Sequence, residues 1–422
     1  MTADARASGL PGASGVLRDV SLSALVAGLV AVLVSYSGPF AVITQAAHAG
    51  HLTEAQTTSW VWAISIGSGV TCFVLSLWTR MPVITAWSTP GAALLISSLG
   101  SYSFSAAVGA YLFAAVAMTI IGLTGALGWV MDRIPKGIVA ALLAGILLHF
   151  VLVAFQTVPS APLLTVSVIV AFVVAKRLVP RYAVLIALLA GVAIAGAQGE
   201  LADMGSVSAQ IAAPTFTMPS FSLLAIVSIG LPLLLVTLTS QNAPGLEVMR
   251  AAGYEPDDRK LVTGTGLASV LLAPFGSHAI NLAAITAAIC TGEEAHPDPR
   301  RRYIAGMATG VFYLLVGLFS VGLVQLFTAL PVALIAVVAG VALLGAVLNG
   351  LVGAMDDVKA RDASLITLAV TASGVTVADI GSAFWGLVAG LVVYAVLTRE
   401  PRRHMGRHDG EVSGKGGDEP SS

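Results

Sequence analysis

The chain has 422 residues, of which 57% are hydrophobic and only 10% are charged. Soluble domains carry about one quarter charged residues, so the composition excludes a soluble globular protein and predicts an integral membrane protein. The formal net charge of −1 argues against nucleic acid as a partner. Both cysteines, Cys72 and Cys290, lie in apolar segments, so we expect no disulfide framework, no metal site and no cofactor.

Fourteen apolar segments follow one another along the chain. A membrane span needs about 20 apolar residues, and nine segments reach that length, starting near Leu22, Thr57, Ala106, Gly137, Pro162, Tyr182, Phe221, Tyr303 and Pro331. Four segments are short or interrupted: Pro82–Ser98, Leu261–Ala273, Ser277–Cys290 and Ser364–Val377. The last segment of the chain is Ser382–Leu397. We predict two halves of seven segments, 19–200 and 221–398, joined by an outer loop at 201–220. Residues 1–18 and 399–422 are expected to be disordered cytoplasmic tails.

The basic residues support the count of fourteen. If the N-terminus is cytoplasmic and every segment crosses, all 21 Lys and Arg residues fall on the cytoplasmic side, where such residues concentrate in membrane proteins. Both termini are then cytoplasmic, and re-entrant segments fit this pattern only in pairs. No Lys, Arg, Asp or Glu lies deep in a predicted span, as expected from the cost of placing a charge at the centre of a bilayer.

The third segment contains a helix start in its middle. Ser88 or Thr89 can cap a helix and Pro90 suits its first position, while Val83–Trp87 is β-branched and aromatic and reads as extended. Five extended residues at about 3.3 Å each rise roughly 16 Å, half of the hydrocarbon core. The helix therefore starts near the midplane, where irregular backbone is tolerated if it is packed in protein or lines a cavity. A simple kink is the alternative.

The third segment of the second half repeats this break. Leu271–Gly276 interrupts the helix and is followed by Ser277–Asn281, after which we expect an apolar helix that runs to Cys290. Because seven is an odd number, the second half is inverted relative to the first. Matching breaks in inverted halves predict a transporter site at the midplane, where two helix N-termini would suit an anion.

The opening segment of each half is also interrupted, at Ser35–Phe40 and at Thr239–Gly245. Polar side chains beside such breaks either line the same cavity or bind the freed backbone groups. Gln241 and Asn242 can donate to a carboxylate while remaining neutral.

Several strings resemble the benzoate/proton symporter family of bacteria: "TAWSTPGAALL", "TSQNAPG", "PFGSHAINLAAITAAIC", "EAHPD" and "GSAFWGL". The resemblance extends from about Leu22 to Leu397. It implies an all-α membrane protein of about 14 transmembrane segments, arranged as a 7+7 inverted repeat with core and gate domains. Two half-helices, each preceded by a short strand, would hold the substrate. Relatives of this fold include nucleobase and sulfate carriers.

The resemblance also implies a function: proton-coupled import of benzoate or a similar aromatic carboxylate, by alternating access across the bacterial inner membrane. The substrate contacts that it implies are Tyr36, Phe40, Ser88, Thr89, Gly91, Gln241, Asn242, Gly276, Ser277, His278 and Asn281. Trp87 and Phe275 flank the two expected half-helix starts and are candidates to pack on an aromatic ring, or simply on the core or lipid.

This chain lacks the acidic side chains that can take up the coupling proton in related carriers. Nucleobase carriers use acidic side chains on segments eight and ten, where this chain has Gln241, Asn242 and Asn281. The candidates are His278, His149 and Asp379, and benzoate can also carry its own proton. Same-fold transport of a nucleobase or an inorganic anion, and a passive channel, remain alternatives, and a homodimer remains possible. The sequence contains no HExxH or GxSxG motif, and we do not expect an enzyme.

Overall fold

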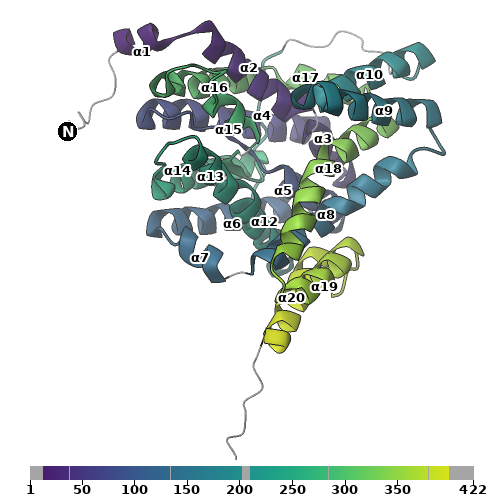
Figure 1. Cartoon of the computed structure of the whole chain (residues 1–422). Helices are drawn as coiled ribbons and strands as arrows, with labels where there is room; N and C mark the ends of the chain where they lie inside the picture. Colours follow the sequence, from purple (N-terminus) through teal and green to yellow (C-terminus); the bar gives the residue numbers. More distant parts are fainter. Residues whose placement is uncertain are drawn as a thin grey trace, which may run out of the picture.

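The computed structural model describes residues 13–37, 39–133, 135–201, 210–283, 285–378 and 380–398. These residues are mostly helical (Figure 1). The elements of the first half are α1 (Ala13–Asp19), α2 (Leu22–Ser37), α3 (Pro39–Ala49), α4 (Glu54–Thr79), β1 (Thr85–Trp87), α5 (Thr89–Ser98), η1 (Leu99–Ser101), α6 (Phe104–Thr124), α7 (Leu127–Arg133), α8 (Lys136–Gln156), α9 (Pro162–Leu178), η2 (Pro180–Tyr182) and α10 (Ala183–Gln198).

The second half begins with α11. Its elements are α11 (Leu223–Ala225), η3 (Ile226–Gly230), α12 (Leu231–Thr237), η4 (Leu238–Asn242), α13 (Ala243–Ala251), α14 (Asp258–Leu272), η5 (Ala273–Phe275), β2 (Ile280–Leu282), α15 (Ile285–Thr291), η6 (Pro299–Arg301), α16 (Tyr303–Leu318), α17 (Ser320–Thr328), α18 (Val332–Asp356), α19 (Arg361–Ala372) and α20 (Ser382–Thr398). The η3 and η4 segments are π-helical turns within one long helix that runs from α11 to α13.

Among the described residues, six helical runs are long and apolar enough to cross a membrane: Leu22–Ala49, Glu54–Thr79, Phe104–Thr124, Lys136–Gln156, Leu223–Ala251 and Val332–Asp356. A seventh span is possible if Pro299–Leu318 and Ser320–Thr328, which meet at 68°, count as one. The membrane character predicted from composition is therefore confirmed. The count of fourteen crossings goes beyond these long helices and stays a prediction.

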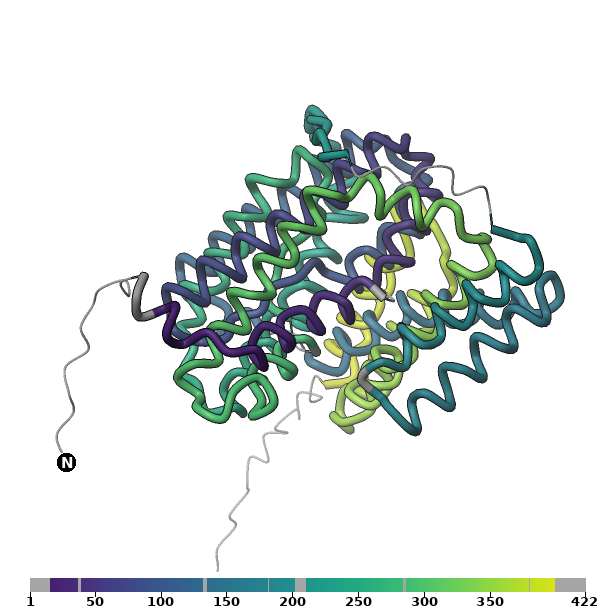
Figure 2. Tube along the Cα trace, turned by 90° about the horizontal axis from the view of Figure 1, so that it is seen from above, coloured from purple at the N-terminus to yellow at the C-terminus, as the bar shows by residue number. Residues whose placement is uncertain are grey.

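The helices pack in two groups (Figure 1). In the first bundle, α4 packs on α16, α6 on α14, and α2 on α16. In the second bundle, α8 packs on α18 and α19, α19 on α20, and α9 on α10. Figure 2 shows the teal α9–α10 pair set to one side of the molecule. Contacts of α3 with α18 and of α5 with α8 join the bundles.

A short antiparallel sheet lies within the first bundle. β1 pairs with β2 in the register Thr85↔Leu282, Ala86↔Asn281 and Trp87↔Ile280. The predicted extended piece before Ser88 is confirmed as β1, and α5 begins at Thr89 with Ser88 as its N-cap. Two distant parts of the chain thus meet at the point where α5 starts.

The helix that we expected after Asn281 starts slightly later, at Ile285. Gly276 ends a 3₁₀ turn in the left-handed region at φ 100°, β2 occupies Ile280–Leu282, and α15 starts at Ile285. Pairing with β1 explains the shift, because the Ala283 N–H also donates to the Ile84 carbonyl at 2.9 Å and so prolongs the ladder. The ladder holds Ile280–Leu282 in an extended conformation, so α15 begins only after it.

Of the outer loop expected at 201–220, the structure describes Leu201 and residues 210–220, and the latter have no regular secondary structure. Its backbone is tied to the first bundle: Thr217 N–H donates to the Pro274 carbonyl at 2.7 Å, and Ser220 N–H donates to the Ser105 carbonyl at 2.9 Å. Part of the expected N-terminal tail is helical, as α1. The predicted tail residues 1–12 and 399–422 lie outside the described part of the chain.

Candidate functional site

A cavity of about 1030 Å³ lies between the two bundles. The first bundle contributes the end of β1, the start of α5, the η4–α13 break and α15, and the second contributes α8 and α18. Four charged side chains, which we call the mouth, are exposed or half-buried at its rim: Lys136, Glu247, Arg250 and Asp258. The opposite part of the lining is apolar or uncharged.

The tip of α5 borders this cavity, but much of its hydrogen-bonding capacity is already used. The Ser88 Oγ accepts the Gly91 N–H at 3.0 Å, and the Ser88 carbonyl accepts the Ala92 N–H at 2.8 Å. Pro90 brings no N–H. Thr89 is half-buried and lines the cavity, whereas Ser88 is fully buried behind it. An anion at this tip would therefore find fewer free backbone donors than the sequence suggested.

His278 holds the α5 tip from the other half of the chain. Its Nε2 lies 2.8 Å from the Ser88 carbonyl oxygen, and the Trp60 Nε1–H donates to its Nδ1 at 3.0 Å. An indole nitrogen only donates and a carbonyl only accepts, so His278 is the neutral tautomer with its hydrogen on Nε2. Both ring nitrogens are engaged, and the ring is buried away from the cavity lining.

Two buried asparagines fix the strand pair. The Asn281 amide satisfies its surroundings when its oxygen accepts the Ser88 N–H and its nitrogen donates to the Leu282 carbonyl, both at 2.9 Å. The Asn242 Oδ1 accepts the Leu282 N–H at 2.9 Å, and its Nδ2 lies 3.3 Å from the Met118 sulfur. Neither lines the cavity. Gln241, the residue before Asn242, does line it and is half-buried.

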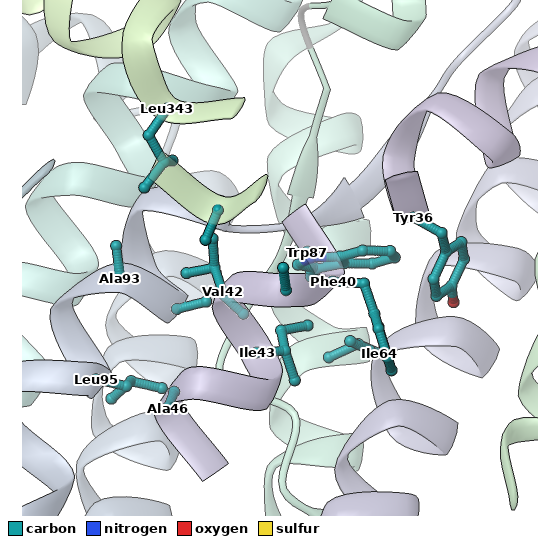
Figure 3. Close-up of a cluster of buried hydrophobic side chains, with 14 of the residues drawn as sticks. Tyr36, Phe40, Val42, Ile43, Ala46, Ile64, Trp87, Ala93, Leu95 and Leu343 are labelled. Carbon is teal, nitrogen blue, oxygen red and sulfur yellow. The ribbon is translucent and has the colours of Figure 1, made fainter. Parts of the chain in front are cut away.

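An aromatic cluster stands behind the end of β1, formed by Tyr36, Phe40, Trp87, Tyr313 and Phe327. The Tyr36 ring centroid lies 4.8 Å from that of Trp87, and the Phe40 and Phe327 centroids are 4.4 Å apart. Figure 3 shows Tyr36, Phe40 and Trp87 gathered in the buried core. Within this cluster Trp87 is the member that reaches the cavity lining. Tyr36 and Phe40, predicted as substrate contacts, lie behind it.

Three candidates from the second break lie away from the cavity. Phe275 packs on Trp62 and Phe216, with ring centroids 5.7 and 5.8 Å apart. Gly276 and Ser277 adjoin it, and none of the three lines the cavity. These three residues precede β2, whereas the residues of this segment that line the cavity, Ala283 and Thr286, follow it.

The remaining proton candidates are not brought to the cavity. His149 is exposed on α8, where its ring contacts the neighbouring Phe150 at 5.4 Å, and it is absent from the lining. Asp379 lies outside the described residues. Over the described ranges, no group of three or more His, Cys, Asp and Glu side chains could hold a metal ion.

Sequence reasoning missed Thr286, in the first turn of α15. It is buried and lines the cavity, and it was missed because a threonine within an apolar run is ordinary. It also missed Lys136, Asp258 and the ion pairs at the mouth. There Arg250 binds Glu247 and Asp258, each at 2.6 Å.

Comparison with known proteins gives a consistent picture. Residues 18–396 match the family model described as "Benzoate membrane transport protein". The chain is 43% identical over 373 residues to "Inner membrane protein YdcO" of Escherichia coli (strain K12), covering 88% of this chain and 95% of that protein. It is 40% identical over 382 residues to "Benzoate membrane transport protein" of Acinetobacter baylyi, covering 90% and 97%.

Solved structures share the fold at low sequence identity. The transmembrane domain of the cyanobacterial bicarbonate transporter BicA aligns with a TM-score of 0.58 and 15% identity, covering 88% of this chain and 97% of that one. Murine Slc26a9, described as an anion transporter in the inward-facing state, aligns with a TM-score of 0.61 and 13% identity, covering 93% and 73%. A further SLC26A9 structure gives 0.60 and 12%, covering 90% and 66%.

Proposed function

Because the chain belongs to the benzoate membrane transport protein family, we propose that it imports benzoate, or a similar aromatic carboxylate, together with protons. Membership of this family makes it a multi-pass membrane transporter with a small-molecule substrate. The choice of substrate, the coupling to protons and the mechanism are the proposed part.

The residues of the cavity wall support an aromatic carboxylate as the substrate. Besides Trp87 the lining includes small apolar side chains, among them Val34, Ala86, Ala342 and Ala346, which suit a flat apolar ring. Thr89 at the start of α5 supplies a polar edge, and the positive end of the helix dipole favours a carboxylate there. This junction of an apolar wall with a helix start is the observation on which the proposal depends.

We place the coupling proton on the substrate rather than on a histidine. The described residues that line the cavity near Trp87 and Thr89 are uncharged, and the carboxylates of the lining stand at the mouth in ion pairs with Arg250. His278 has both nitrogens engaged. A bound carboxylate is itself able to take up a proton, so benzoate and proton can travel together.

The two bundles support transport by alternating access. We take the first bundle as the core that carries the substrate and the second as the gate. Basic residues favour the cytoplasmic side, so the mouth with Lys136 and Arg250 would face the cytoplasm, and the state would be inward-facing. On the other side of the cavity, Leu343 of α18 belongs to the same buried cluster as Val42 and Ala93 of the core (Figure 3). Fourteen crossings with both termini cytoplasmic fit this orientation.

The test is uptake of labelled benzoate into proteoliposomes with an imposed inward proton gradient, with unlabelled uracil and sulfate as competitors. Protein-free liposomes are the control, because neutral benzoic acid crosses bilayers unaided. We expect protein-dependent accumulation that a protonophore abolishes and that neither competitor reduces. Equilibration without accumulation would indicate a channel or uniporter, and competition by uracil or sulfate would assign a different substrate.

A further inference from the structure

Among the Lys, Arg, Asp and Glu side chains that the structure describes, Arg302 alone is buried. It is 6% exposed and stands immediately before α16. It forms no ion pair with the described residues, whereas its neighbour Arg301 is exposed and pairs with Asp19 and Asp298. A buried charge that no other group compensates is strongly unfavourable. The position of Arg302 therefore requires other groups that bind its guanidinium.

Three backbone carbonyls supply that binding. The Arg302 Nη1 donates to the Thr291 carbonyl and the Nε to the His296 carbonyl, both at 2.7 Å, and the Nη2 donates to the Pro297 carbonyl at 3.4 Å. Thr291 is the last residue of α15, and the other two lie in the loop that follows it. The last carbonyls of a helix have no donor within the helix, and a positive charge is favourable beside them. Arg302 thus closes the C-terminal end of α15.

The loop around Arg302 contains the string "EAHPD", Glu294–Asp298, which the sequence analysis singled out. Within it the His296 Nδ1 accepts the Asp298 N–H at 2.9 Å, and the Asp298 carboxylate accepts the Arg300 N–H at 2.9 Å. These side chains bind backbone groups of their own loop, and none of the residues of the string lines the cavity. The string therefore shapes the turn that receives the Arg302 side chain.

α15 has only seven residues, and different parts of the chain hold its two ends. Before its start, the Ala283 N–H donates to the Ile84 carbonyl at 2.9 Å and prolongs the strand ladder. At its end, Arg302 binds Thr291. Ala283 and Thr286, at the first end, line the cavity. Because a helix of seven residues is only about 10 Å long, a displacement of its C-terminal end also moves this part of the cavity wall.

We propose that Arg302 is a positioning residue of the transport site: by binding the C-terminal end of α15, it holds the part of the cavity wall that Ala283 and Thr286 form. This assignment rests on the proposed function and deepens it. Arg302 itself does not line the cavity, so it acts through α15. Its loss should loosen α15 and weaken substrate binding while the rest of the first bundle stays folded.

The experiment is calorimetric binding of benzoate to the purified full-length protein, together with its thermal unfolding. Arg302→Gln removes the charge and cannot reach all three carbonyls, so we expect benzoate binding to weaken by about tenfold or more. Arg302→Lys keeps the charge but lacks the planar fork of donors, and its affinity should lie between those of Arg302→Gln and the wild-type protein.

Asp19→Asn is the control for stability. It removes the ion pairs with Arg80 and Arg301, close to the start of α16, and leaves the bonds between Arg302 and the carbonyls in place. We expect it to lower the midpoint of thermal unfolding and to leave benzoate affinity within about twofold.

Two buried cysteines provide a local readout. Cys290 lies in α15 next to Thr291, and Cys72 lies in α4. In Arg302→Gln we expect a thiol reagent to modify Cys290 several-fold faster than in the wild-type protein, and Cys72 at an unchanged rate, because α15 opens locally. Equal acceleration at both cysteines would mean that the whole bundle is destabilised, and would overturn the positioning role.

Wild-type benzoate affinity in Arg302→Gln, measured well below its unfolding midpoint, would also overturn the assignment, because Arg302 would then serve stability alone. The proposed function would be unaffected by that result. If Arg302→Gln does not fold, Arg302→Lys takes its place in the comparison with Asp19→Asn. Absence of benzoate binding by the wild-type protein would overturn the proposed function and the assignment with it.

Discussion

The His278 imidazole donates from Nε2 to the Ser88 carbonyl across 2.8 Å, and so a residue of the second half holds the residue that caps α5 in the first. The Trp60 Nε1–H, on α4, fixes the other ring nitrogen at 3.0 Å. The two hydrogen bonds connect α4, the N-cap of α5 and the segment before β2. Because both ring nitrogens are engaged, His278 has none with which to take up a proton or bind a ligand. This relationship makes His278 a positioning residue.

Replacement of His278 by glutamine tests that role. A glutamine amide donates and accepts while remaining neutral, so His278→Gln should preserve both bonds and leave the pH dependence of proton-driven uptake unchanged. The measurement is initial uptake in proteoliposomes between pH 5.5 and 7.5. A pH profile that became flat in this variant would show that His278 carries the proton.

His278→Ala is the companion variant for stability. It leaves the Trp60 N–H buried without a partner, which costs about 1–3 kcal/mol, so we expect a lower midpoint of thermal unfolding in detergent. Addition of benzoate would raise that midpoint in the wild-type protein by mass action.

Gly91 has a packing role, although it was predicted as a substrate contact. A Cβ at this position would lie 2.6 Å from the Leu233 Cδ1 and 2.9 Å from the Ser88 Oγ. Gly91→Ala should therefore push α5 from α12 and lower stability by about 1–3 kcal/mol, measured by thermal unfolding. Gly345→Ala on α18 is the control, because no atom lies within 4 Å of its added Cβ. Equal stability of the two variants would contradict the packing argument.

Trp87 and Phe275 were equivalent candidates in the sequence analysis, but we expect their replacement to have different effects on benzoate affinity. Trp87 lines the cavity, whereas Phe275 packs on Trp62 and Phe216. Loss of the Trp87 ring removes aromatic packing from the cavity wall, so Trp87→Leu should weaken benzoate affinity by at least about tenfold. Phe275→Leu should change affinity by less than about twofold. The opposite order would place the substrate at the second break instead of in the cavity.

The sequence predicted the β1–α5 junction because its signals are local. The cap at Ser88, the proline at position 90 and the β-branched run before them lie within a few residues of one another. The start of α15 could not be predicted in the same way, since it depends on the pairing of Ile280–Leu282 with β1, a strand almost 200 residues earlier. Local sequence patterns do not show which distant strand a segment will pair with.

The same limit applies to the polar candidates. The sequence marked Asn242, Asn281 and His278 as unusual in an apolar segment, and the structure has all three buried and hydrogen-bonded to the backbone around the strand pair. Their residue types indicated a broken helix but not what each side chain faces. Thr286 was missed for the complementary reason, since a threonine in an apolar run is ordinary and only its lack of a preceding helical turn sets it apart.

The mouth of the cavity provides a final prediction. Arg250 is neutralised by two carboxylates, whereas Lys136 forms no ion pair with the residues that the structure describes. Lys136 therefore leaves a positive charge at the rim, which should attract a benzoate anion from the side that the mouth faces. Lys136→Gln should slow benzoate exchange from that side several-fold at low salt, and the difference should vanish near 1 M salt, where the Debye length is about 3 Å.

The control for this effect is Lys260→Gln. Lys260 is paired with Asp257 at 3.0 Å and lies away from the cavity lining, so its removal changes net charge equally without altering the rim. We expect it to exchange benzoate at the wild-type rate. A salt-independent defect in Lys136→Gln would mean that Lys136 acts through packing on α8, and an equal defect in both variants would attribute the effect to overall charge.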